Sequence, residues 1–135
     1  MELVPKVGIG PLRFGMSPVE VRALLPEEST YEEWMGGNLN DSLLYHGLII
    51  GFDECDSMGP LPDSRLNRIC VFGREDAVIW GRGICDWTKE EATTHLDQSR
   101  ISYRNLDSGD VSVQDLSLTL SFDNSNHLEY VEVWP

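Results

Sequence analysis

Two segments of the chain carry the apolar spacing and end signals of short amphipathic helices. In the segment 17–26, Val21, Leu24 and Leu25 recur at helical spacing, and Pro26 ends the pattern. The segment 85–98, which reads CDWTKEEATTHLDQ, repeats the starting signals of the first. The pattern therefore predicts two helices, far apart in the sequence, that begin in the same way.

Each predicted helix has a capping box and a hydrophobic staple at its start. A Ser or Thr at the N-cap is followed three residues later by Glu, and an apolar residue before the cap faces another at the fourth helical position. These pairs are Ser17–Glu20 with Met16–Val21, and Thr88–Glu91 with Trp87–Ala92. Pro18 also suits the first helical position of the first segment.

A matching pair of strands follows each helix. The first pair has a strand ending at Phe52-Asp53 and a return strand over 66–71, and the second has a strand ending at Phe122-Asp123 and a return strand over 128–133. The N-cap and the Phe at the corner are separated by 35 residues in the first copy and 34 in the second. This agreement predicts an internal repeat.

We therefore predict one α+β domain, 1–135, made of two degenerate repeats, 8–72 and 81–134. Each repeat is a helix followed by antiparallel strands, and the helices cover one face of the resulting sheet. Further strands are predicted at 76–80 and 101–103, and the glycine pairs 8/10 and 81/83 are expected to turn the chain into each helix. Trp80, Trp87 and Trp134 are expected in the core.

Charge narrows the class of partner. The chain of 135 residues has 10 Lys and Arg against 23 Asp and Glu, a formal net charge of −13, spread over both halves. Such a surface repels nucleic-acid backbones and anionic lipid, and it favours a basic protein partner, although ordinary solubility is an equally good explanation. Without an evident signal segment or a long apolar run, we expect a cytoplasmic protein that does not enter the membrane.

The sequence shows no arrangement typical of an enzyme, a metal site or a cofactor site. The three histidines are isolated, and the three cysteines, Cys55, Cys70 and Cys85, have no C-x-x-C spacing and are expected to be reduced. Cys55 stands among carboxylates that would raise its thiol pKa and so disfavour a nucleophilic role. A hydrolase using Asp53 and Asp123 is conceivable, but a structural role at equivalent turns explains both residues more simply.

Two acidic segments are candidate partner-binding surfaces. The loop FDECDSMGPLPDSR carries Asp53, Glu54, Asp56 and Asp63 around two stiffening prolines, whereas its counterpart in the second repeat needs only FDNSNH. Extra loops on a repeated scaffold often carry function, and a neutral insertion is the alternative. The second candidate is Glu32, Glu33 and Trp34, where an aromatic anchor stands among carboxylates; the alternative is an inward-facing Trp34.

The stretch GPLRFGMSPVEVRALL resembles the opening of the SmpA/BamE-like and beta-lactamase-inhibitor-protein-like modules. The resemblance covers 10–25 and implies helices followed by an antiparallel sheet, a unit that the inhibitor duplicates. Those relatives are exported, whereas this chain is expected to stay in the cytoplasm, so their tasks need not transfer. In overall character the chain is also similar to immunity proteins of bacterial contact-dependent and polymorphic toxin systems.

These observations predict a non-enzymatic inhibitory binding protein. We expect it to act as an immunity protein that covers the active or substrate-binding surface of a basic toxin, such as a nuclease. The alternative is a structural or assembly adaptor of the SmpA/BamE type, which would carry an exposed hydrophobic groove.

Overall fold

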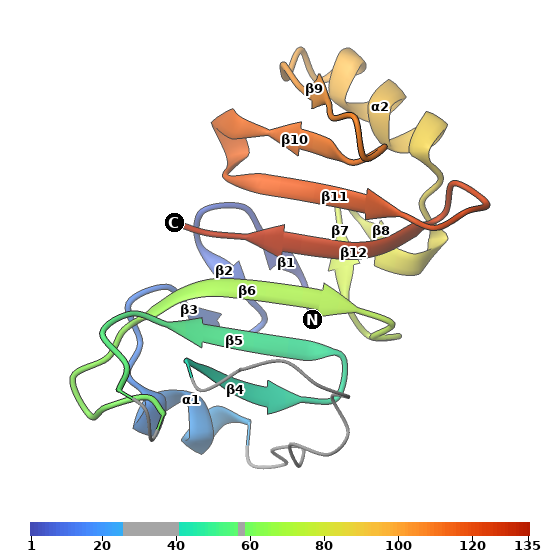
Figure 1. Ribbon diagram of the computed structural model, residues 1–135. Helices are drawn as coiled ribbons and strands as arrows, with labels where there is room; N and C mark the ends of the chain where they lie inside the picture. Colours follow the sequence, from blue (N-terminus) through green and yellow to red (C-terminus); the bar gives the residue numbers. More distant parts are fainter. Residues whose placement is uncertain (26–40, 57–58) are drawn as a thin grey trace.

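A seven-stranded antiparallel sheet runs through both halves of the chain (Figure 1). The structure, a computed structural model, describes residues 1–25, 41–56 and 59–135. In spatial order the strands are β4 (Ser42–Tyr45), β5 (Leu48–Phe52), β6 (Leu66–Phe72), β12 (Leu128–Val133), β11 (Leu118–Phe122), β10 (Val111–Val113) and β9 (Arg104–Asn105). The protein therefore has the α+β class that its sequence predicts.

Smaller elements complete the fold around this sheet. A three-stranded sheet contains β1 (Leu3–Val4), β2 (Gly8–Ile9) and β3 (Leu12–Arg13), and a separate hairpin contains β7 (Val78–Ile79) and β8 (Arg82–Gly83). The α-helices are α1 (Pro18–Leu24) and α2 (Lys89–Gln98), and two 3₁₀ turns are η2 (Ile84–Asp86) and η3 (Gln114–Leu116). Each α-helix follows one of the small hairpins, and the two helices lie toward opposite ends of the strand order (Figure 1).

Both predicted capping boxes are confirmed. The Ser17 hydroxyl accepts a hydrogen bond from the Glu20 amide at 3.3 Å, and the Glu20 carboxylate accepts one from the Ser17 amide at 3.2 Å. Thr88 and Glu91 make the same reciprocal pair at the start of α2, at 3.2 and 3.1 Å. These bonds satisfy amides that have no partner within the helix itself.

The two halves also share their strand register. Leu48 lies opposite Val71 in the first half, and Leu118 lies opposite Val133 in the second. In both halves the register shifts at the residue just before the corner phenylalanine, between 51 and 52 and between 121 and 122. A bulge at the same place in both copies extends the repeat from sequence spacing to backbone geometry.

The halves meet at β6 and β12, which form the centre of the sheet. Val71 pairs with Val131, the counterpart of Ile69, and Ile69 pairs with Val133, the counterpart of Val71. Cys70 pairs with Glu132, the residue at its own equivalent position. An approximate twofold axis therefore passes between these two residues.

One face of the sheet is buried against both helices. A single hydrophobic cluster joins alternate residues of the sheet strands to Val21 of α1 and to Ala92 and Leu96 of α2, all three of which are fully buried. Trp87 also belongs to this cluster and is 6% exposed. Both helices thus cover the same face, in agreement with the sequence.

The opposite face of the sheet is only partly buried. Phe72 and Tyr130 pack there with ring centroids 6.4 Å apart, and the Tyr130 hydroxyl donates a hydrogen bond of 2.8 Å to Cys70 Sγ. Burial raises the pKa of both the Cys70 thiol and the Tyr130 hydroxyl, so each stays protonated at neutral pH.

Local details differ from the sequence expectations in three places. The strand predicted at 76–80 is limited to β7 (Val78–Ile79), because the chain turns at Trp80. The segment 101–103 is not a strand, because the chain pairs with β10 only at 104–105. Both glycine pairs fall in the small hairpins before the helices, but at different positions: Gly10 begins one turn, whereas Gly81 follows Trp80 in the other. Apolar spacing does not fix the register of such short strands.

Candidate binding surfaces

The loop between β5 and β6 is longer in the first repeat than its counterpart in the second. It spans 53–65 and is called the acidic loop here, whereas the equivalent turn between β11 and β12 spans only 123–127. The strands on either side keep the same pairing, since Phe52 lies opposite Leu66 and Phe122 lies opposite Leu128. The acidic loop is therefore an insertion into a hairpin whose strand pairing is otherwise the same in both repeats.

Backbone and carboxylate hydrogen bonds close the base of the acidic loop. The Asp53 amide donates to the Arg65 carbonyl at 3.1 Å, and the Arg65 amide donates to Asp53 Oδ1 at 2.7 Å. Asp123 closes the shorter turn in a similar way, since its Oδ1 accepts from the amides of Ser125 at 2.8 Å and His127 at 3.0 Å. The hydrogen bond from His127 is the main reason that the pKa of Asp123 lies below its usual value.

These hydrogen bonds bear on the hypothesis that Asp53 and Asp123 form a catalytic pair. Asp53 and Asp123 both hold turns, and β5 and β11 end at opposite ends of the sheet (Figure 1). Each aspartate therefore has the structural role at a turn that the sequence favours.

A buried serine holds the interior of the acidic loop. Ser64 is fully buried; its Oγ accepts a hydrogen bond from the Leu61 amide at 2.9 Å and donates one to the Glu54 carbonyl at 3.2 Å. This hydroxyl links the two sides of the loop, so the backbone that presents the carboxylates is fixed by more than its ends.

Three of the four predicted loop carboxylates point to solvent. Glu54, Asp56 and Asp63 are exposed, whereas Asp53 is half-buried and bound to the Arg65 amide. Glu54 has a positive φ of 50°, a conformation that few residues other than glycine adopt. The loop therefore presents Glu54, Asp56 and Asp63, and Asp53 supports them.

Cys55 lies beneath these carboxylates and faces inward. Its Sγ is 3.5 Å from the carbonyl oxygens of Phe52 and Asp53 and 3.9 Å from Ser64 Oγ. Burial raises the pKa of this thiol, the Ser64 hydrogen bond opposes that shift, and the carboxylates of Asp41, Asp53 and Asp56 raise it further. A thiol with a raised pKa is a poor nucleophile at neutral pH.

The second predicted surface, Glu32, Glu33 and Trp34, lies outside the residues that the structure describes. It stays a prediction from the sequence.

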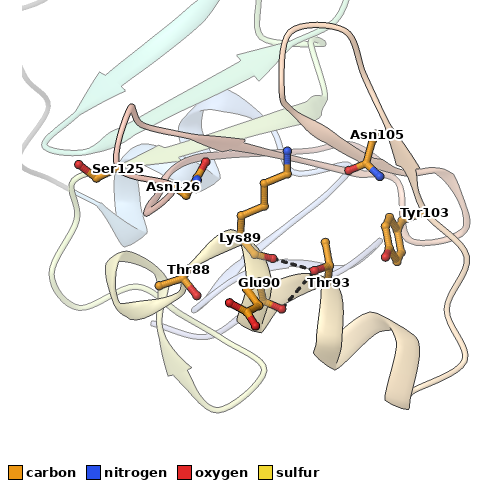
Figure 2. Close-up of a pocket in the computed structure, with 8 residues that line it drawn as sticks. All are labelled: Thr88, Lys89, Glu90, Thr93, Tyr103, Asn105, Ser125 and Asn126. Atoms are coloured by element: carbon orange, nitrogen blue, oxygen red, sulfur yellow. Dashed lines mark hydrogen bonds between the residues drawn. The ribbon is translucent and has the colours of Figure 1, made fainter.

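A shallow polar cavity lies at the start of α2 (Figure 2). Its volume is about 530 Å³, and its lining residues are Thr88, Lys89, Glu90, Thr93, Tyr103, Asn105, Ser125 and Asn126. Several of these groups are already engaged: Lys89 Nζ donates to the Gly109 carbonyl at 2.9 Å, and Thr93 Oγ1 donates to the carbonyls of Lys89 and Glu90. Small-molecule sites are mostly apolar with a few free polar groups, and this cavity does not have that character.

The sequence did not point to one aromatic cluster on the second half. Trp80 and Trp134 were expected in the core, but both are only half-buried, and Trp87 alone of the three is buried as expected. The Trp80 ring lies 5.7 Å from that of Trp87 and 4.7 Å from that of His95. The signal available in the sequence was Trp80-Gly81, since a bulky residue is unusual where a tight hairpin turn forms.

Within the described parts of the chain, no three His, Cys, Asp or Glu side chains come close enough to hold a metal ion. No helix among the described residues has the length and apolar character that a membrane span requires. Comparison of the chain with family models, with curated proteins and with solved structures finds no match.

Proposed function

We propose that this protein is a non-enzymatic inhibitor of the immunity type, which binds a basic toxin domain and covers its active or substrate-binding surface. The toxin class that fits best is a nuclease, because its substrate-binding surface must be cationic to hold a phosphate backbone. The binding protein would then present carboxylates where the toxin binds phosphates.

The acidic loop is the observation that carries this proposal. It is eight residues longer than the five-residue turn at the equivalent position of the second repeat. It has exposed carboxylates at positions 54, 56 and 63. Hydrogen bonds of Asp53 and Ser64 hold the described part of its backbone, which lowers the conformational entropy that this part loses when a partner binds. A net charge of −13 adds long-range attraction for a cationic partner.

Such an inhibitor needs no chemistry of its own. Charge complementarity raises the association rate, and the buried contacts that form afterwards set the dissociation rate. The side chains of Cys55 and Asp53 both form hydrogen bonds that hold the acidic loop, and this structural use agrees with a binding role for the loop.

An assembly adaptor is the second candidate. The half-buried pair Phe72 and Tyr130 on the helix-free face of the sheet favours it, because an adaptor requires exposed apolar surface. On this hypothesis the acidic loop would be a neutral insertion.

A charge-reversal experiment separates these functions. The loop variant Glu54→Lys/Asp56→Lys/Asp63→Lys leaves Asp53 in place, because that carboxylate holds the loop. The matched control Glu75→Lys/Asp107→Lys/Glu129→Lys changes three exposed carboxylates of the second half by the same total charge. The partner is first isolated from the native host on immobilised wild-type protein, and binding is then followed by surface plasmon resonance at several salt concentrations.

We expect the association rate constant of the loop variant to fall at least about tenfold and to depend less on salt concentration. The control variant should change this rate constant much less. The wild-type protein should also inhibit the isolated toxin. Equal rates for the two variants would show that the loop is not the contact surface, and recovery of envelope-assembly proteins alone would favour the adaptor.

A further inference from the structure

The second repeat carries a charged aromatic cluster, and the described residues at the corresponding positions of the first repeat do not form one. The Trp80 patch is defined here as Trp80, Arg82, Trp87, Glu91 and His95, contributed by the β7–β8 hairpin, by the N-terminal side of α2 and by the helix itself. Trp80 and Trp87 meet edge to face at 88°, and His95 packs on Trp80 at 4.7 Å. No step of the proposed inhibition uses these residues.

An arginine is already bound inside this patch. The Arg82 guanidinium carbon lies 4.0 Å from the centre of the Trp87 ring. Arg82 Nη2 also forms an ion pair with Glu91 Oε2 at a distance of 2.9 Å. Arg82 Nε is buried and has no hydrogen-bond partner among the described residues. The patch therefore combines the two features that bind a guanidinium group, an aromatic face and a carboxylate.

Trp80 is held in a conformation that disfavours it. The hairpin turn consists of Trp80 and Gly81, with φ values of 52° and 78°, and glycine or asparagine is the usual first residue of such a turn. A bulky side chain at positive φ is strained, and strain of this kind gathers at functional sites.

The first repeat shows that the scaffold does not need Trp80 or Arg82, although it keeps the glutamate of the capping box as Glu20. Strand pairing places Gly10 at the position of Trp80 and the fully buried Leu12 at that of Arg82. The residue before the helix cap is Met16 where the second repeat has Trp87, and both carbonyls accept the amide that starts the return strand, from Leu66 and Leu128 respectively. Since one copy folds with small and apolar residues there, folding alone does not account for the Trp80 patch.

We propose that the Trp80 patch is a second binding surface, which receives an arginine side chain of a basic protein segment by stacking on Trp80 and pairing with Glu91. Trp80 packs against the core and is half-buried, so it keeps some contact with solvent. The Glu91 side chain keeps 46% of its surface exposed despite its ion pair with Arg82 and its hydrogen bonds from Thr88. The net charge of −13 favours the approach of a cation. Trp and Arg are also the residues that most often dominate binding energy at protein interfaces.

This surface is separate from the acidic loop. The carbonyl of Met16 binds the strand that follows the acidic loop, and that of Trp87 binds the strand that follows the short turn, so the approximate twofold axis places the two surfaces at opposite ends of the sheet. The two binding activities can therefore be removed one at a time.

The test measures binding of an N-acetylated octa-arginine peptide by calorimetry, together with the indole N–H signals of the four tryptophans in NMR spectra. Trp80→Gly introduces the residue found in the first repeat, which relieves the strained backbone. Glu91→Gln removes the charge and keeps a side chain that can complete the capping box. Glu20→Gln makes the same change at the equivalent capping-box position of α1, which belongs to neither proposed surface, and is the matched control.

We expect Trp80→Gly and Glu91→Gln each to weaken peptide binding by roughly fivefold to tenfold, and Glu20→Gln by less than about twofold. The Trp80 indole signal should shift most on peptide addition, and an octa-lysine peptide should bind more weakly than octa-arginine. Unchanged binding by Trp80→Gly, or an equal loss in Glu20→Gln and Glu91→Gln, would overturn the proposal and assign binding to overall charge.

Discussion

Replacing the acidic loop with its own counterpart tests both the repeat and the binding surface. Residues 53–65 are exchanged for the five residues Asp-Asn-Ser-Asn-His of the turn 123–127. The exchange joins strands of matching register, since Phe52 and Leu66 pair as Phe122 and Leu128 do. It removes four carboxylates and one arginine and adds one aspartate, which changes the net charge from −13 to −11.

Two opposing effects set the expected stability. Shortening a closed loop from 13 to five residues stabilises the folded state by about 0.8 kcal/mol, because less chain entropy is lost on closure. Phe52 is 4% exposed under the acidic loop, whereas Phe122 beside the short turn is only half-buried, so the exchange uncovers part of an aromatic ring at a loss of about 1 kcal/mol. Ser64 leaves together with its hydrogen-bond partners, so no buried polar group is left unpaired.

We therefore expect the free energy of unfolding to stay within about 1.5 kcal/mol of the wild-type value. Urea denaturation followed by circular dichroism measures this quantity, and surface plasmon resonance against the isolated partner measures binding. The exchanged protein should fold and should lose most of its affinity for a basic partner.

A second variant separates charge from length. A 13-residue Gly/Ser loop in place of 53–65 keeps the length and removes every carboxylate, and it should lose binding as well. A protein that fails to fold after the five-residue exchange would refute the reading of the loop as an insertion on a repeated scaffold. A folded protein with full affinity would refute the loop as a binding surface.

Two further predictions concern the cysteines and the turn aspartate. Alkylation by iodoacetamide, mapped by mass spectrometry, should modify the exposed Cys85 first, Cys55 more slowly because burial raises its pKa, and Cys70 last because it is 4% exposed; equal rates for Cys55 and Cys85 would contradict this order. Because hydrogen bonds lower the pKa of Asp123 below its ordinary value of 3.8, its contribution to stability is fully present above that pH and is lost as the pH falls through the lower folded-state pKa. The difference in urea midpoint between the wild type and Asp123→Asn should therefore shrink on acidification from pH 6 to pH 3, and a difference that grew would show the opposite sign of coupling.

The sequence alone was sufficient for the repeat and for the start of each helix. Capping boxes depend on residues three apart in the chain, so Ser17–Glu20 and Thr88–Glu91 could be recognised without tertiary information. Matching spacing from cap to corner then identified the hairpins. Asp53 could also be assigned to a turn from the sequence, because its counterpart in the second repeat, Asp123, occupies the same corner.

Only the tertiary structure distinguished the loop carboxylates that face solvent from the one that holds the loop. Asp53 and Glu54 are neighbours of the same charge, and their roles differ because the Arg65 amide, 12 residues away, reaches one of them. The partial burial of Trp80 was equally hidden, because it depends on packing against Trp87 and against His95 of α2. Local patterns determine where helices and turns begin, whereas exposure depends on contacts between segments distant in the chain, and those contacts form only when the sheet closes around its central strands.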